Sequence, residues 1–222
     1  MLFNWDNQFI RQLFYFCTMQ NVQILELTAA TIYLMDLTDF QYTNVLHLLN
    51  DIEKKHLNEI KSEQKKCEYA AIRWMKTNLF GAISIEYASD GSPIIHLPYF
   101  ISISHTEKYA CLAVSKTHKI GVDIEAIREK SVNVQHKFCN EDEASLFDIS
   151  NPREMTLLWS LKESLYKLSD RQQLLFKTDI CIDKRLPEII ARVRFEDGFK
   201  SAKLAYQVIE NHILTYTISA PI

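Results

Sequence analysis

Two acidic residues alternate with apolar ones in a short segment near the middle of the chain, KIGVDIE at positions 119–125. Side chains alternate between the two faces of a β-strand, so Asp123 and Glu125 are expected on one face, roughly 6–7 Å apart at Cα. Their oxygens can converge on a hard cation such as Mg²⁺. The alternative is a solvated polar strand face. Gly121 inside this strand indicates that another group packs closely against it.

A second group of charged residues lies in WSLKESLYK, positions 159–167. Residues four apart share a face of a helix, so Trp159, Glu163 and Lys167 form one stripe and Lys162 falls on the adjacent one. A third carboxylate beside a lysine is suited to a metal ion that is bridged to an anion such as phosphate. The alternative is an ordinary surface Glu–Lys pair.

A third group is ISISHT, positions 101–106, in which Ser104 and His105 offer hydrogen-bond donors for a phosphate. A basic cluster on and before a predicted helix adds positive charge and comprises Lys65, Lys66, Arg73 and Lys76. The alternatives are a structural histidine at a strand end and a solvated helix face.

The composition is that of a globular protein without a general affinity for nucleic acid. The 222 residues are 47% hydrophobic, and 25 Lys and Arg against 28 Asp and Glu give a formal net charge of −3. Neutralising many phosphates needs a basic surface, which this balance does not provide. The five cysteines form no C-x-x-C pair, which favours a reducing cytoplasm over a disulfide framework. No apolar run is long enough for a bilayer, so we expect a cytoplasmic protein that does not bind membranes.

Hydrophobic periodicity and turn residues predict the elements that must position these groups. Strands are expected at 22–37 (one or two), 83–87, 101–104, 109–115, 120–125, 203–209 and 213–219. Helices are expected at 44–60, 67–79, 141–149 and 152–168. Asn140 with Glu143 has the form of a capping box, and Pro152 suits the first position of a helix.

These elements predict an α+β fold of two similar lobes. Each lobe should hold a small, mainly antiparallel sheet packed on helices. We expect a peripheral N-terminal extension at 1–18, an N-terminal lobe at 19–118, and a C-terminal lobe at 119–222 that carries the metal and catalytic motifs.

Taken together, ISISHT, GVDIE and WSLKESLYK resemble the motifs of the 4′-phosphopantetheinyl transferases in order and approximate spacing. FCNEDEASLF, between the last two, also resembles that family. The two-lobed length is similar to the monomeric, pseudo-dimeric branch that activates surfactin-type synthetases. The resemblance implies that the two lobes are related by a pseudo-twofold axis and that coenzyme A binds in the cleft between them.

The resemblance also implies roles for individual residues. The carboxylates that match the Mg²⁺ (or Mn²⁺) ligands are Asp123, Glu125 and Glu163. Catalytic roles fall to Glu163, which would help to deprotonate the carrier serine, to Lys167 and to Asp123. The residues that match contacts to coenzyme A are Lys65, Arg73, Ser104, His105, Lys162 and Lys167. Relatives usually have a lysine where this chain has Ser92, which cannot supply that positive charge, so the departure bears on nucleotide affinity and on which basic residue replaces the lysine.

The activity that the resemblance implies is Mg²⁺-dependent transfer of 4′-phosphopantetheine from coenzyme A to a serine of an acyl or peptidyl carrier protein. Such carriers serve fatty-acid, polyketide or nonribosomal-peptide synthesis. One alternative is a homologue that binds coenzyme A or the carrier without turnover. Another is a different Mg²⁺-dependent phosphotransferase, although the absence of G-x-x-x-x-G-K-[ST] excludes the P-loop class.

Overall fold

The computed structural model describes residues 22–169 and 173–219. The predicted N-terminal extension, 1–18, lies outside this range. In the described part of the chain, no helix combines the length and the apolar character that a membrane span requires.

The first half of the chain forms an antiparallel sheet with the strand order β1-β2-β6-β5. Its strands are β1 (Val22–Glu26), β2 (Ala30–Asp36), β5 (Phe100–His105) and β6 (Tyr109–Ser115). The accompanying elements are the 3₁₀ helix η1 (Tyr42–Leu48), α2 (Asp51–Glu59), α3 (Glu63–Phe80) and the short pair β3 (Ile85–Tyr87) and β4 (Pro93–Ile95). Helix α3 packs its apolar side against β2 and β6.

The second half forms an antiparallel sheet with the order β7-β11-β10-β9-β8. Its strands are β7 (Val122–Ala126), β8 (Ile180–Lys184), β9 (Ile189–Phe195), β10 (Gly198–Ile209) and β11 (His212–Thr217). The helices are α4 (Lys130–Val134), the 3₁₀ helix η2 (Gln135–Lys137), α5 (Glu141–Leu146) and α6 (Pro152–Leu168). Helix α6 covers the face of this sheet at β7 and β11.

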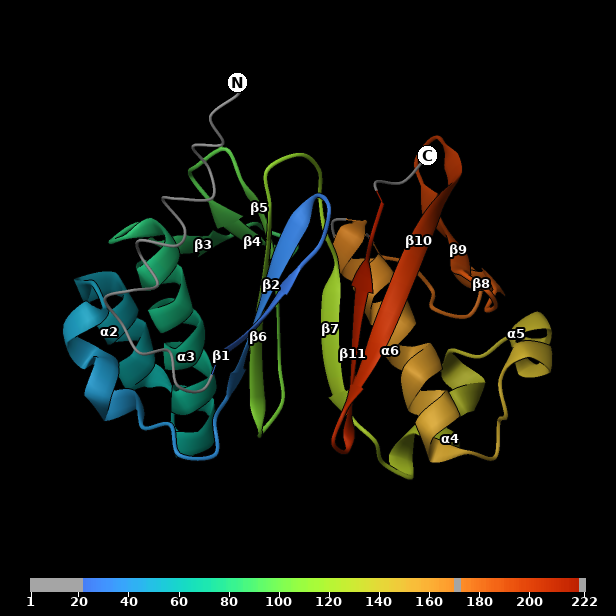
Figure 1. Cartoon of the computed structure of the whole chain (residues 1–222), viewed down its shortest axis with the longest axis horizontal. Helices are drawn as coiled ribbons and strands as arrows, with labels where there is room; N and C mark the ends of the chain where they lie inside the picture. The colour runs from blue at the N-terminus through green and yellow to red at the C-terminus, as the bar shows by residue number, and fades with distance from the viewer. Residues whose placement is uncertain (1–21, 170–172, 220–222) are drawn as a thin grey trace, which may run out of the picture.

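The molecule is a stack of four layers in which the two sheets lie between α3 on one side and α6 on the other (Figure 1). A core of apolar residues fills the space between the sheets, with Ile32 and Leu34 from the first and Ile124 and Leu214 from the second. Burial of these side chains joins the two halves into one body.

The α+β class expected from the sequence is confirmed, while the pseudo-twofold relation of the halves stays a prediction. Helix α6 has the expected bounds, and Asn140 with Glu143 forms the predicted capping box. Helix α3 begins earlier than expected because Ser62 caps it. The helix predicted over 44–60 is divided, since Asn50 forms a capping box with Glu53 and starts α2 there. Strands β4, β8 and β9 and helix α4 were not predicted.

Gly121 precedes β7 at the point where α6 comes closest. A Cβ atom at this position would lie 1.8 Å from the backbone carbonyl oxygen of Ser164 on α6. The group that packs closely against Gly121, as the sequence indicated, is therefore the backbone of α6. Only glycine lets β7 and α6 come this close.

Gly121→Ala should destabilise the fold by at least about 2 kcal/mol, because backbone atoms of α6 cannot rotate away as a side chain would. Thermal unfolding would show a clearly lower Tm. Ala126→Ser, at the end of the strand that Gly121 precedes and half-buried, is the control and should change stability by no more than about 0.5 kcal/mol. Equal Tm values for Gly121→Ala and Ala126→Ser would contradict the conclusion that position 121 has no room for a side chain.

Candidate functional site

The edges of the two sheets meet through serine hydroxyls at what we call the β5–β7 junction, formed by Ser102 and Ser104 of β5 and by Val122 to Ile124 of β7. The backbone N–H of Val122 donates to Ser102 Oγ at 3.1 Å, and that of Ile124 donates to Ser104 Oγ at 3.2 Å. Two serines at alternate positions thus satisfy backbone groups on the neighbouring strand edge.

Asp123 is the centre of this junction and is only 4% exposed. Its Oδ1 accepts hydrogen bonds from Ser104 Oγ and Lys167 Nζ, each at 2.8 Å. Its Oδ2 accepts from Ser160 Oγ, also at 2.8 Å. ISISHT, GVDIE and WSLKESLYK, which lie far apart in the sequence, therefore meet at one buried carboxylate. Sequence reasoning missed Ser160, although it lies within the helix motif.

Glu125 lies two residues farther along β7 and is half-buried. Trp159 Nε1 on α6 donates to its Oε1 at 3.2 Å. Burial, and then the negative charge of Asp123, raise the pKa of Glu125 above its usual value. Glu125 and Trp159 line a cavity of about 470 Å³ whose wall also carries Arg128, Lys130 and Lys137.

The donor set fits an oxygen-ligated cation in part. Glu125 and Asp123 repel one another, and a cation between them would relieve the repulsion that raises the pKa of Glu125. Asp123 Oδ2 accepts one hydrogen bond, so it keeps a lone pair for a metal. Glu163 is half-buried on α6. Over residues 22–169 and 173–219, however, no three His, Cys, Asp or Glu side chains are close enough to hold a metal together. Asp123, Glu125 and Glu163 would have to come closer together for one metal ion to contact all three.

Three of the predicted anion-binding residues gather at a second cavity, of about 330 Å³, between α3 and β5: Lys65, Arg73 and His105. Arg73 is 3% exposed, and its guanidinium carbon lies 3.8 Å from the ring centre of Tyr69. Its Nη2 donates to Tyr87 Oη at 3.1 Å, whereas its Nε has no hydrogen-bond partner in the structure. A buried guanidinium N–H without a hydrogen-bond partner is suited to bind an anionic ligand.

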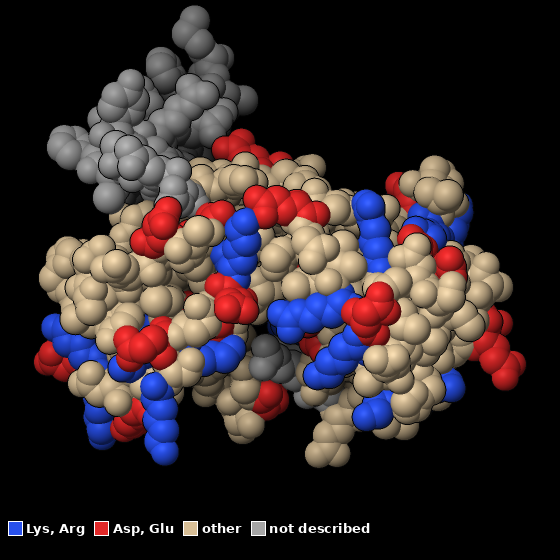
Figure 2. Space-filling model, turned by 90° about the horizontal axis from the view of Figure 1, so that it is seen from below, with Lys and Arg blue, Asp and Glu red and all other residues tan. Residues whose placement is uncertain are grey.

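A third cavity, of about 520 Å³, contains Ser92 together with Lys119 and Lys167. The hydroxyl and backbone N–H of Ser92 both donate to Asp90 Oδ1, at 2.7 and 2.9 Å. Ser92 therefore turns toward its own loop, and the positive charge at this cavity comes from the two lysines. Seen from below, Lys and Arg side chains border a hollow near the middle of the molecule (Figure 2).

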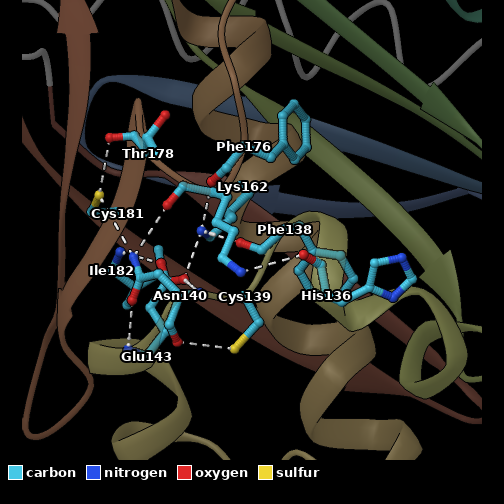
Figure 3. A network of polar contacts seen from close by, with 11 residues as sticks. His136, Phe138, Cys139, Asn140, Glu143, Lys162, Phe176, Thr178, Cys181 and Ile182 are labelled. Atoms are coloured by element: carbon cyan, nitrogen blue, oxygen red, sulfur yellow. Dashed lines mark hydrogen bonds and ion pairs between the residues drawn. The ribbon is translucent and has the colours of Figure 1, made fainter.

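Lys162 lies apart from these cavities and does not fit the predicted contact with coenzyme A. It is 0% exposed, and its Nζ donates to Phe138 O, Phe176 O and Glu143 Oε2 at 2.6, 2.7 and 2.7 Å. These three acceptors use all of its donors. Figure 3 shows the ammonium group enclosed by α5, α6 and the segment before β8.

Glu143 extends the network around Lys162. Its Oε2 also accepts from the backbone N–H of Asn140, and its Oε1 accepts from that of Ile182 on β8. Lys162 and Glu143 therefore fix α6 relative to α5 and β8. Lys76, another member of the basic cluster, is likewise buried and is paired with Glu53 of α2 at 3.0 Å.

Lys162→Met should cost about 3–5 kcal/mol of stability, because Glu143 would be left as a buried charge without its partner. Lys203→Met is the matched control: Lys203 pairs with Glu188, both half-exposed, and its loss should cost about 1 kcal/mol or less. Urea unfolding of both variants measures the difference. Similar midpoints would show that the buried pair contributes no more than a surface pair.

The comparisons with known proteins each match less than half of the chain. Residues 119–217 match the family model described as the 4′-phosphopantetheinyl transferase superfamily. The chain is also 27% identical, over 104 residues, to a protein of Aneurinibacillus migulanus described as 4′-phosphopantetheinyl transferase gsp. That alignment covers 45% of this chain and 44% of the relative, so the match spans less than half of the curated relative's length. The resemblance to the 4′-phosphopantetheinyl transferase superfamily is therefore confirmed over residues 119–217, which contain GVDIE and WSLKESLYK, whereas ISISHT lies before this range.

Proposed function

We propose that this protein is a transferase that moves 4′-phosphopantetheine from coenzyme A to a serine of an acyl or peptidyl carrier protein. The observation that carries the proposal is the convergence of the three motifs at Asp123, with Ser104 and Lys167 both bonded to its Oδ1 at 2.8 Å. The match of residues 119–217 to the superfamily also supports it.

In the proposed reaction, the serine oxygen of the carrier forms a bond to the phosphorus that bears pantetheine. The bond from this phosphorus to adenosine 3′,5′-bisphosphate breaks, and the serine proton goes to a base, for which Glu163 is the candidate. Such a transfer depends mainly on charge neutralisation and alignment. A divalent cation, Mg²⁺ or Mn²⁺, bound by Asp123 and Glu125 and reached by Glu163, would supply positive charge beside the diphosphate.

The cavities suggest where the parts of coenzyme A lie. We assign the diphosphate to Lys167, which is 11% exposed and can turn from Asp123 toward an anion. We assign a remote phosphate to the cavity of Arg73, His105 and Lys65. Lys119, which shares a cavity with Ser92 and Lys167, is our candidate for the positive charge that Ser92 lacks. We omit Lys162, because its donors are already used.

Activity is tested by incubating the protein with coenzyme A, MgCl₂ and a panel of apo-carrier proteins, and measuring the carrier mass. A gain equal to one phosphopantetheine group is expected on at least one carrier. No gain on any carrier, with coenzyme A still bound, would favour the alternative of a binding homologue without turnover.

Removal of divalent metal should abolish the transfer. EDTA in excess is expected to stop the mass gain, and MgCl₂ or MnCl₂ added afterwards should restore it, because oxygen ligands select these cations. ZnCl₂ at the same concentration serves as the comparison. Transfer that continues at full rate in EDTA would contradict the metal assignment.

Lys167→Gln and Arg73→Gln should separate kcat from KM. Lys167→Gln keeps a donor for Asp123 but removes charge near the reacting phosphate, so kcat should fall about 10²-fold or more with a smaller change in KM. Arg73→Gln removes a contact that is equally strong in the ground and transition states, so KM for coenzyme A should rise with kcat little changed.

The control for this pair is Arg192→Gln, on the surface, where Arg192 pairs with Asp183. It should leave both constants unchanged. If Lys167→Gln alters only KM and Arg73→Gln alters only kcat, the two assignments are reversed.

A further inference from the structure

A buried carboxylate lies in the cavity that we assign to an anionic group. Glu68 on α3 is 3% exposed and lines the same cavity of about 330 Å³ as Lys65, Arg73 and His105. A negative charge here repels a phosphate, so its presence in a cationic pocket needs a reason. The reason lies in what Glu68 does to His105.

Glu68 Oε2 is the partner of His105 Nδ1, at 2.8 Å, and of Lys65 Nζ, at 2.7 Å. Gln64 Nε2 lies 3.4 Å from the other oxygen of Glu68. The Nε2 atom of His105 has no hydrogen bond to any residue that the structure describes, and the His105 side chain is 39% exposed. The ring therefore presents Nε2 to an incoming ligand, while Nδ1 faces Glu68.

The protonation state of the ring decides what Nε2 can bind. When the Nδ1–H group of a neutral imidazole donates a hydrogen bond to Glu68, Nε2 carries no proton and can only accept a hydrogen bond. It then cannot donate one to a phosphate oxygen. Both nitrogens donate only in the imidazolium form. Contact with a phosphate through Nε2 thus requires a second proton on the ring, and Glu68 supplies the negative charge that offsets it.

We propose that Glu68 is a positioning residue that holds His105 as a doubly donating imidazolium when a phosphate group binds, so that binding of the nucleotide is coupled to uptake of a proton at His105. The inference rests on the proposed function, because the nucleotide is the adenosine 3′,5′-bisphosphate part of coenzyme A.

The electrostatic surroundings of His105 support this coupling. Burial lowers the pKa of His105, Glu68 raises it, and Lys65 and Lys167 lower it. The net pKa lies below the usual value of 6.5 in the absence of ligand. Arg73 of α3 also lines the cavity, together with the phenol groups of Tyr69 and Tyr87. The ring is therefore mostly neutral at pH 7, and an anion at Nε2 raises its pKa, so a proton is taken up on binding.

The test is calorimetric titration of adenosine 3′,5′-bisphosphate at pH 7 into the full chain, in several buffers of different ionisation enthalpy. The slope of enthalpy against buffer ionisation enthalpy gives the number of protons taken up. Wild type should take up a large fraction of one proton. Glu68→Gln has nearly the same shape but no charge, and should show much less uptake and about tenfold weaker binding.

Glu63→Gln is the matched control, on the same helix, where Glu63 pairs with Lys66 and its side chain is 69% exposed. It should keep the wild-type uptake and affinity. If Glu68→Gln does not fold, NMR titration of the His105 ring in wild type, assigned with His105→Gln, should show its pKa rise when the bisphosphate is added.

Two results overturn the coupling and are distinguishable from each other. Binding with equal proton uptake in wild type and Glu68→Gln, or an unchanged pKa of His105 on binding, overturns the role of Glu68 and leaves the proposed function standing. Failure of wild type to bind the bisphosphate at all overturns both.

Discussion

The structure depends on the hydrogen bonds and the ion pair that surround one buried carboxylate, Asp123. A carboxylate that is 4% exposed is stable only if hydrogen bonds and positive charge replace the water it has lost. Ser104 from one sheet, and Ser160 and Lys167 from α6, provide that replacement. These contacts join the two halves of the chain at the residue that the proposed chemistry needs.

Two further constraints keep α6 at the distance that Asp123 requires. Gly121 allows the backbone of α6 to approach β7, since any Cβ there would overlap the carbonyl oxygen of Ser164. Lys162, on the other side of α6, is bonded to Glu143 and to two carbonyl oxygens in the C-terminal half. The helix motif thus contains residues of two kinds: Lys167 and Glu163 are the ones we propose for chemistry, whereas Lys162 fixes the helix that carries them.

The sequence predicts the structural features that depend on residues close to one another in the chain. The start of α5 was predictable because Asn140 and Glu143 cap it locally, and the alternation around Asp123 correctly indicated a strand. Contacts between distant segments were not predictable in this way. Lys162 follows Leu158 by one helical turn, but the sequence does not show that the carbonyl groups of Phe138 and Phe176 enclose its ammonium group. Glu68 was missed for the same reason, because its partner His105 lies on another element.

The central claim is that the junction at Asp123 is where a divalent cation and the diphosphate of coenzyme A meet. A crystal structure of the protein with coenzyme A and Mn²⁺ tests it most directly, since the anomalous signal locates the metal. We expect the metal peak at Asp123 and Glu125, the diphosphate against Lys167, and the 3′-phosphate in the cavity of Arg73 and His105. Coenzyme A bound away from these residues, or a metal peak that touches neither carboxylate, would contradict the account.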